Sequence, residues 1–160
     1  MTTHGIRLLQ PTDHVALAVL MEEMQAHYRV PCPSRATIVA GLAALPVGVT
    51  IFVAVEDEAV LAFASLCNFY PGPGLRPGLF LKEIYVAAAA RGRGLGHALM
   101  RASAAFAVAR GDGRIDWTAD ADDPDLLRFY DSLGAVAHPK KLFYRLIGDA
   151  LVDLAGAVED

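Results

Sequence analysis

The spacing of hydrophobic residues predicts four main helices. In residues 94–110 apolar side chains recur three and four positions apart, so they share one face of a helix. The same spacing predicts three more helices, over residues 12–28, 34–45 and 123–133. Thr12 and Ser34 are the expected N-caps of the first two, and Asp123 followed by Pro124 is a typical start for the third.

Runs of β-branched and aromatic residues between these helices predict strands. They cover residues 6–9, 50–55, 60–69, 79–86, 114–119, 136–138 and 142–147. Acidic residues 56–58 form the turn of one hairpin, and the last two strands are expected to form another. The segment from residue 79 to 119 reads strand, helix, strand, which requires a right-handed crossover between parallel strands.

These elements predict an α/β fold in a single domain of residues 1–160. Its mixed, largely antiparallel sheet contains one parallel βαβ crossover and carries helices on both faces. Residues 149–160 are expected to form a C-terminal tail or short helix. Its apolar residues could contribute to a homodimer interface: Leu151, Val152 and Leu154.

Composition excludes several classes of protein. The 160 residues are 54% hydrophobic and 20% charged, unlike a disordered chain. The net charge of −4 argues against nucleic-acid binding through phosphate contacts. Two cysteines without a CxxC motif exclude a disulfide scaffold, and the histidines lack ligand spacing, so we expect no metal site.

The sequence also predicts neither a signal peptide nor a membrane span. Residues 1–10 lack a charged region followed by an apolar core. Residues 36–55 carry no charge, but Gly41, Pro46 and Gly48 divide them, which favours a buried helix, a turn and a core strand. The expected location is the cytoplasm.

The segment from Arg91 to Gly96, Arg-Gly-Arg-Gly-Leu-Gly, is the strongest candidate for a binding site. Three glycines leave the backbone uncovered before a helix N-terminus, where N–H groups can surround a phosphate or pyrophosphate. Arg91 and Arg93 add positive charge. The spacing fits neither a Walker loop nor a dinucleotide fingerprint. A purely structural turn with solvated arginines, and a site for another nucleotide, remain alternatives.

The same segment resembles a cofactor signature. Arg91-x-x-Gly94-x-Gly96, after a strand ending in Ile84-Tyr85-Val86, is similar to the Q/R-x-x-G-x-G/A pattern of the GNAT superfamily of N-acyltransferases. The order of predicted elements agrees with that family, and the resemblance is firm over residues 79–134. It implies a GNAT-like fold with acetyl-CoA as co-substrate.

A second segment supports the resemblance. Phe129-Tyr130-x-x-Leu133-Gly134 resembles the family's Phe-Tyr-x-x-Leu-Gly motif, and residues 81–86 are similar to the corresponding strand of diamine acetyltransferases. Three residues depart from the pattern, and one of them, Ala135, stands where Phe is common after the Leu-Gly pair. Lys82 replaces the first of two acidic residues and leaves only Glu83, and Asp123 stands where the family usually has Asn.

The resemblance implies roles for individual residues. The backbone of Ile84, Tyr85 and Val86 would pair with the pantetheine arm, and the Val86 N–H would polarise the acetyl carbonyl. Further cofactor contacts are expected from Arg91, Gly92, Arg93, Gly94, Leu95, Gly96, His97 and Asp123. His97 could equally be a solvated helix residue.

Two catalytic residues are expected from the same resemblance. Glu83 would act as base for an amine that arrives protonated, and Tyr130 would protonate the leaving thiolate. The structural alternatives are a solvent-facing Glu83 and a tyrosine that belongs to the core.

The expected partner is a small-molecule amine acceptor, with no nucleic acid and no membrane. The leading hypothesis is an acetyl-CoA-dependent N-acetyltransferase that acts on a small amine, polyamine or amino-acid-like acceptor. The alternative is a catalytically weak module of the same fold that senses acyl-CoA. The sequence does not identify the acceptor.

Overall fold

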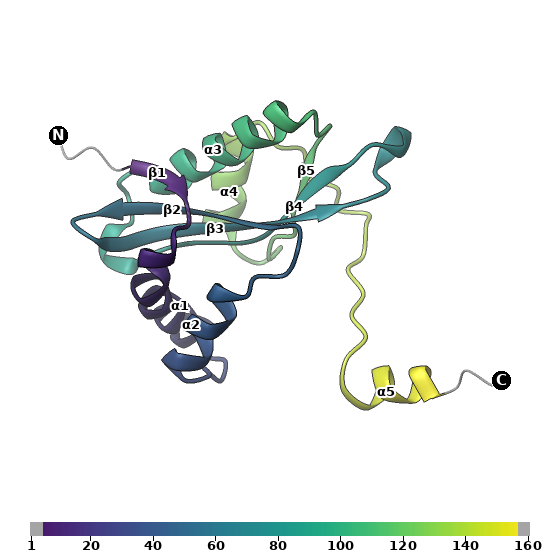
Figure 1. Ribbon diagram of the computed structural model, residues 1–160. Coiled ribbons are helices and arrows are strands. Elements are labelled where there is room, and N and C mark those ends of the chain that lie inside the picture. Colours follow the sequence, from purple (N-terminus) through teal and green to yellow (C-terminus); the bar gives the residue numbers. More distant parts are fainter. Residues whose placement is uncertain (1–4, 157–160) are drawn as a thin grey trace. The chain divides into compact units, whose positions relative to one another are not determined.

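A mixed sheet organises the protein, as the sequence predicts, and it has five strands. The computed structural model describes residues 5–156. The strands lie in the order of the chain: β1 Gly5–Leu8, β2 Val49–Glu56, β3 Ala59–Phe69, β4 Gly78–Val86 and β5 Ile115–Asp116 (Figure 1). The first three pairings are antiparallel and the pairing of β4 with β5 is parallel. The predicted fold class is therefore confirmed.

The chain divides into two compact units, Met1–Thr118 and Ala119–Asp160, and each is described by itself. The first contains the sheet, α1 His14–Tyr28, α2 Arg35–Ala43, α3 Leu95–Arg110 and three short 3-10 turns: η1 Pro11–Asp13, η2 Pro73–Leu75 and η3 Ala88–Ala90. The second contains α4 Pro124–Ser132 and α5 Gly148–Gly156.

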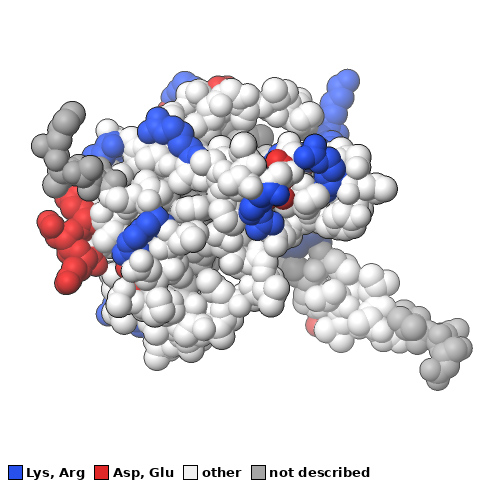
Figure 2. All heavy atoms as spheres, turned by 45° about the horizontal axis from the view of Figure 1, so that its top comes forward, with Lys and Arg blue, Asp and Glu red and all other residues white. Residues whose placement is uncertain are grey.

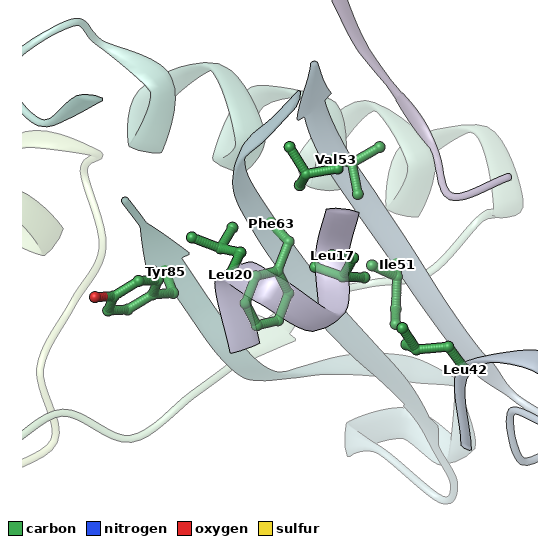
Figure 3. Close-up of a cluster of buried hydrophobic side chains, with 8 residues drawn as sticks. Leu17, Leu20, Leu42, Ile51, Val53, Phe63 and Tyr85 are labelled. Carbon is green, nitrogen blue, oxygen red and sulfur yellow. The ribbon is translucent and has the colours of Figure 1, made fainter. Parts of the chain in front are cut away.

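Helices α1 and α2 cover one face of the sheet and α3 covers the other (Figure 1). On the first face, Leu17 and Leu20 of α1 pack against sheet residues that include Val53 and Phe63 (Figure 3). On the second face, Phe52 meets Phe106 of α3 edge-on at 5.7 Å between ring centroids. The predicted crossover is confirmed, since α3 joins β4 to the parallel strand β5.

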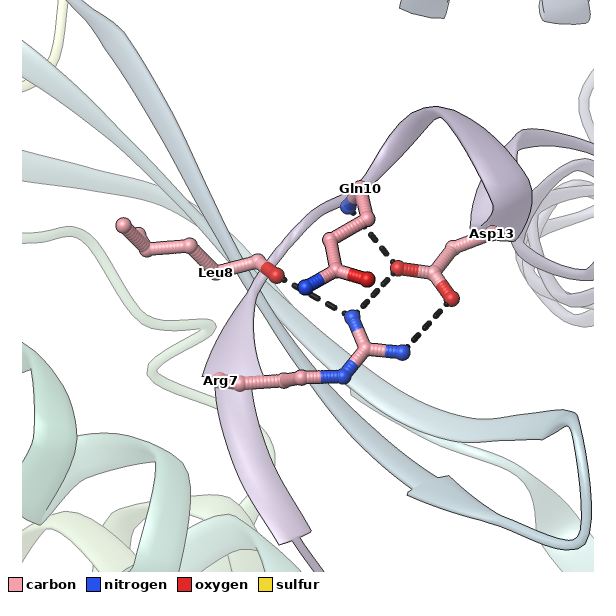
Figure 4. Close-up of polar contacts among 4 residues, drawn as sticks. All are labelled: Arg7, Leu8, Gln10 and Asp13. Atoms are coloured by element: carbon pink, nitrogen blue, oxygen red, sulfur yellow. Dashed lines mark hydrogen bonds and ion pairs between the residues drawn. The ribbon is translucent and has the colours of Figure 1, made fainter.

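The first helix begins differently from the prediction. Thr12 lies inside η1 and does not cap α1, which begins at His14. Asp13 takes the polar role at this junction: its Oδ2 accepts the Gln10 backbone N–H at 2.8 Å. The two terminal nitrogens of Arg7 donate to Asp13 at 2.6 and 2.8 Å (Figure 4). This guanidinium lowers the pKa of the buried Asp13 carboxyl.

The other predicted caps are confirmed. The Ser34 hydroxyl accepts the Thr37 N–H at 3.2 Å, and Asp123 caps α4 through the N–H of Leu126 at 3.0 Å. The uncharged stretch also folds as predicted, into α2, a turn containing Gly48, and β2. Among residues 5–156, no helix combines the length and the apolar character needed to cross a bilayer.

The predicted strands at 136–138 and 142–147 are wrong. Neither segment forms a strand, and Leu142, Phe143 and Tyr144 are exposed. β-Branched and aromatic content predicts a strand only where a partner supplies hydrogen bonds, and these residues pair with none of the described strands. The expected strand at 114–119 is also shorter, because its pairing with β4 ends after two residues.

The C-terminal tail forms a short helix, α5, close to where the sequence predicts one, and residues 157–160 lie outside the described part. Leu151, Val152 and Leu154 are exposed on it. The contribution of this segment to a homodimer stays a prediction.

We predict that Asp13→Asn lowers the free energy of unfolding by about 2 kcal/mol at pH 7, because it removes the charge-assisted bidentate hydrogen bonds from Arg7, whose side chain is partly exposed. Asp125→Asn removes an ion pair that is exposed on both sides, and we expect a loss below about 1 kcal/mol. Urea unfolding of both variants measures this.

The effect of Asp13 should also depend on pH. Its pKa is lower in the folded state, so its contribution is complete above the unfolded pKa of about 3.9 and is lost as the pH falls through the folded pKa. The stability difference between wild type and Asp13→Asn should therefore shrink below about pH 4. An unchanged difference would show that the ion pair is not the stabilising interaction.

Candidate functional site

The free edge at the end of β4 is the central feature of the site. β4 pairs with β3 along its whole length, but it pairs with β5 only at Leu79 and Phe80. Residues 83–86 therefore have a strand of the first unit on one side only. Their other edge can offer backbone N–H and C=O groups to a ligand, in the way that an added strand would bind.

A β-bulge at Lys82 determines which N–H groups point to that edge. Ser65 of β3 lies opposite Glu83, and Leu66 lies opposite Leu81, so Lys82 is an extra residue in β4. Before the bulge, the Leu79 N–H donates to Arg114 on the β5 side at 3.1 Å.

After the bulge the alternation is reversed. The Ala87 N–H donates to Leu61 of β3 at 2.8 Å. Because alternate residues of an antiparallel strand bond to the same neighbour, the N–H groups of Tyr85 and Glu83 also face β3. Those of Ile84 and Val86 face the free edge. The bulge thus places the Val86 N–H on the side where sequence analysis expects it to bind a carbonyl.

Glu83 lies at this edge, in contact with the end of α1. Its Oε1 accepts the Tyr28 hydroxyl at 3.3 Å. Burial raises the pKa of the Glu83 carboxyl, and this effect outweighs the lowering by the Tyr28 hydrogen bond, the Lys82 charge and the Ile84 N–H. A carboxylate whose pKa is raised binds a proton more tightly than an ordinary glutamate does, which suits a base beside a free strand edge.

Tyr85 links β4 to both α1 and the glycine segment. It is buried, and its hydroxyl donates to Glu23 Oε1 of α1 at 3.0 Å. The same oxygen accepts the Ala88 N–H at 2.8 Å. Arg91 donates from Nε to the Val86 carbonyl at 3.2 Å and from Nη2 to the Tyr85 hydroxyl at 3.4 Å. Burial, followed by the bond to Glu23, raises the pKa of Tyr85.

The glycine segment has the backbone shape of an anion-binding turn. Gly92 and Gly94 have φ angles of +76° and +78°, which side chains rarely adopt. A Cβ at either position would meet nothing within 4 Å, so the backbone conformation, not crowding, favours glycine there. The first bond of α3 runs from the Ala98 N–H to the Gly94 carbonyl at 3.0 Å.

The residues around these glycines have different surroundings. Leu95 is 2% exposed and anchors the segment in the core. Gly96 and His97 lie in the first turn of α3, at the helix end that favours anions. Arg93 pairs with Glu56 of β2 at 2.5 Å, and Arg91 is held against β4, so both arginines have protein partners rather than being simply solvated.

Asp123 and Tyr130 belong to the second unit. Asp123 is the N-cap of α4, and Tyr130 on the same helix is buried. The Phe129 and Tyr130 rings lie 5.2 Å apart. Asp123 therefore has a structural role in α4 beside the cofactor contact expected from the sequence.

Within the first unit, one connection from β4 to α3 brings most of the predicted site together. Tyr28 and Glu23, which approach from α1, are not among the residues that the sequence predicts for the site. Their signal is weak, because a tyrosine at a helix end and an acidic pair in an apolar helix occur for many reasons. Within residues 5–156, no group of His, Cys, Asp or Glu side chains could hold a metal ion.

One protein-family model matches this chain. The model of the Acetyltransferase (GNAT) family matches residues 17–135, a range that includes every predicted site residue. The L-ornithine N5-acetyltransferase NATA1 of Arabidopsis thaliana is 30% identical over 96 residues. These are 60% of this chain and 42% of that protein, so the match spans less than half of its length.

Solved structures share the fold over nearly the whole chain. An integron cassette protein from the mobile metagenome of V. cholerae has a TM-score of 0.86 at 30% identity, with 98% of this chain and 99% of that one covered. A Trypanosoma brucei acetyltransferase has a TM-score of 0.73 at 21% identity, covering 90% and 100%. At that identity the second likeness concerns the fold alone.

We predict that Gly92→Ala and Gly94→Ala each destabilise the protein by about 1 kcal/mol, because alanine is strained at a positive φ. Gly113→Ala is the matched control: a Cβ there also meets open space, but the φ angle is not in the strained region. It should be neutral or slightly stabilising. Thermal unfolding of the three variants distinguishes them, and equal effects would contradict the conformational argument.

Proposed function

Because the chain belongs to the acetyltransferase (GNAT) family, we propose that it is an acetyl-CoA-dependent N-acetyltransferase for the primary amine of a small molecule. The single observation that carries this proposal is the free edge of β4, where the Val86 N–H faces outward, with Glu83 on the same strand and the glycine segment in the connection that follows it. One connection thus offers an oxyanion donor, a base and an anion-binding turn.

The residues present fit acetyl-CoA. The co-substrate supplies an acetyl group activated as a thioester. The free edge of β4 would bind the pantetheine amides as an added strand does, and the turn at Gly92 and Gly94 would receive the pyrophosphate. The Val86 N–H would stabilise negative charge on the acetyl oxygen during the reaction.

Proton transfers accompany each stage of the chemistry. An alkylamine has a pKa of about 10 and arrives protonated, so Glu83 removes its proton directly or through water. The amine nitrogen then forms a bond to the acetyl carbon as the carbon–sulfur bond breaks. The leaving thiolate, whose thiol has a pKa of about 8.5, takes a proton from Tyr130, the residue matched by the resemblance. The acylated nitrogen loses its second proton to water to become the neutral amide, and water returns a proton to Tyr130.

The acceptor is proposed as a small amine, a polyamine or an amino-acid-like amine. The printed name of the Arabidopsis relative, an L-ornithine N5-acetyltransferase, supports an amino-acid-like acceptor. On the face shown in Figure 2, Lys and Arg side chains are spread out and do not form one continuous basic surface. This supports a small acceptor over nucleic acid, whose phosphates require clustered positive charge.

The proposal predicts that the wild-type protein releases CoA thiol from acetyl-CoA when an amine is supplied from a panel of polyamines, amino acids and peptides. Glu83→Gln and Tyr130→Phe should each lower kcat by about 100-fold or more, because each removes a proton-transfer group. Glu58→Gln, an exposed carboxylate in the β2–β3 turn, is the control and should leave kcat unchanged.

Two results would contradict the assignment. Unchanged turnover in Tyr130→Phe would remove the acid role from Tyr130. Binding of acetyl-CoA without thiol release across the panel would favour the second candidate, an acyl-CoA-sensing module of the same fold.

The pH profile should depend on the hydroxyl of Tyr28. This hydrogen bond lowers the pKa of Glu83, so Tyr28→Phe should raise that pKa and move the acidic limb of the kcat/KM profile to higher pH. Tyr70→Phe changes an exposed ring that contributes nothing to the Glu83 shift and should leave the limb in place. A limb that stays fixed or moves to lower pH in Tyr28→Phe would show that another group is the base.

A further inference from the structure

Glu23 of α1 joins the end of β4 to the start of the β4–α3 connection through one oxygen. Its Oε1 accepts the Tyr85 hydroxyl at 3.0 Å and the Ala88 N–H at 2.8 Å. Tyr85 lies two residues after Glu83, and Ala88 is the first residue of η3, which leads into the glycine segment. A single carboxylate therefore holds both the end of the strand and the start of the connection.

The polar contacts continue from Tyr85 to Arg91. The Arg91 guanidinium donates to the Tyr85 hydroxyl, which in turn donates to Glu23. The guanidinium also lies 5.6 Å from the centre of the Tyr85 ring and donates to the Val86 carbonyl. Cation, hydroxyl and carboxylate thus form a chain in which each hydrogen bond strengthens the next.

The chain ends on the peptide group that follows Val86. Because Arg91 holds the Val86 carbonyl, the chain limits rotation of the backbone at the residue whose N–H faces the free edge. Glu23 itself touches no expected reacting atom. Its two hydrogen bonds give this exposed carboxylate of α1 a structural role beside the buried Tyr85.

We propose that Glu23 is a positioning residue: through Tyr85, Ala88 and Arg91 it holds the end of β4 and the glycine segment in the conformation that binds acyl-CoA. This inference rests on the proposed function, since it assigns the same site to acyl-CoA. The positioning role of Glu23 affects binding of the co-substrate more than the chemical step. The acetyl-CoA affinity should therefore change more than kcat.

The test compares Glu23→Ala and Glu23→Gln with wild type by calorimetric binding of acetyl-CoA. Loss of the acceptor in Glu23→Ala should raise Kd about fivefold to tenfold, the size expected when a charge-assisted hydrogen bond is lost at a partly exposed position. The Gln amide carbonyl can still accept from Tyr85 or Ala88, so Glu23→Gln should recover most of the affinity. Its neighbour Glu22, which pairs with Arg35 of α2, supplies the control Glu22→Ala with unchanged Kd.

Two further readouts separate positioning from a general loss of stability. Amide exchange at Ala88 in the ligand-free protein should become faster in Glu23→Ala and stay unchanged in Glu22→Ala. Tyr85→Phe, which keeps the ring and removes the hydroxyl, should also raise Kd, and adding it to Glu23→Ala should cause little further loss.

The outcomes are distinguishable. If the wild-type protein binds acetyl-CoA, the proposed function stands. The positioning role is then overturned if Glu23→Ala leaves either the Kd for acetyl-CoA or the amide exchange at Ala88 unchanged. A wild-type protein that binds no acetyl-CoA would overturn both.

Discussion

The extra residue at Lys82 is the constraint on which the site depends. Without it, the alternation that directs the Leu79 N–H towards β5 would also direct the N–H of Ala87 away from β3. The bulge reverses this alternation at the point where β4 and β5 cease to pair, so β3 still holds the strand while Val86 faces the free edge. The end of the pairing with β5 leaves part of an interior strand available to a ligand, and the bulge determines which N–H groups that ligand meets.

The rest of the first unit keeps this edge in place. The core beneath α1 and α2 includes Tyr85, and α3 anchors the glycine segment through the buried Leu95. Helix α1 reaches the edge at two points, with Tyr28 on Glu83 and Glu23 on Tyr85. The same contact with α1 therefore influences both the proton affinity of the base and the backbone that would bind the co-substrate.

Much of the fold could be predicted from local signals. Ser34 and Asp123 cap helices as expected, and the crossover through α3 follows from hydrophobic period and length. The errors are non-local. Thr12 loses the cap position because Asp13 gains Arg7 as a partner from β1, and residues 142–147 form no strand because propensity does not supply a pairing partner.

The candidate site shows the same contrast between features that local sequence predicts and contacts that depend on distant residues. The glycine segment and Glu83 are visible as residues near one another in sequence. The bulge, and the contacts of Tyr28 and Glu23 with β4, depend on register and on helix packing. No spacing rule in a single sequence reports either of these.

Amide hydrogen exchange at Val86, measured with and without acetyl-CoA, tests the central claim most directly. The account predicts that the Val86 amide exchanges faster than that of Tyr85 in the ligand-free protein, because only the Tyr85 N–H faces β3. Acetyl-CoA should slow exchange at Val86, whereas ATP, which has phosphates but no pantetheine arm, should not. Unchanged exchange at Val86 in the acetyl-CoA complex, or equal slowing by ATP, would contradict the claim that the free edge of β4 binds the acyl group.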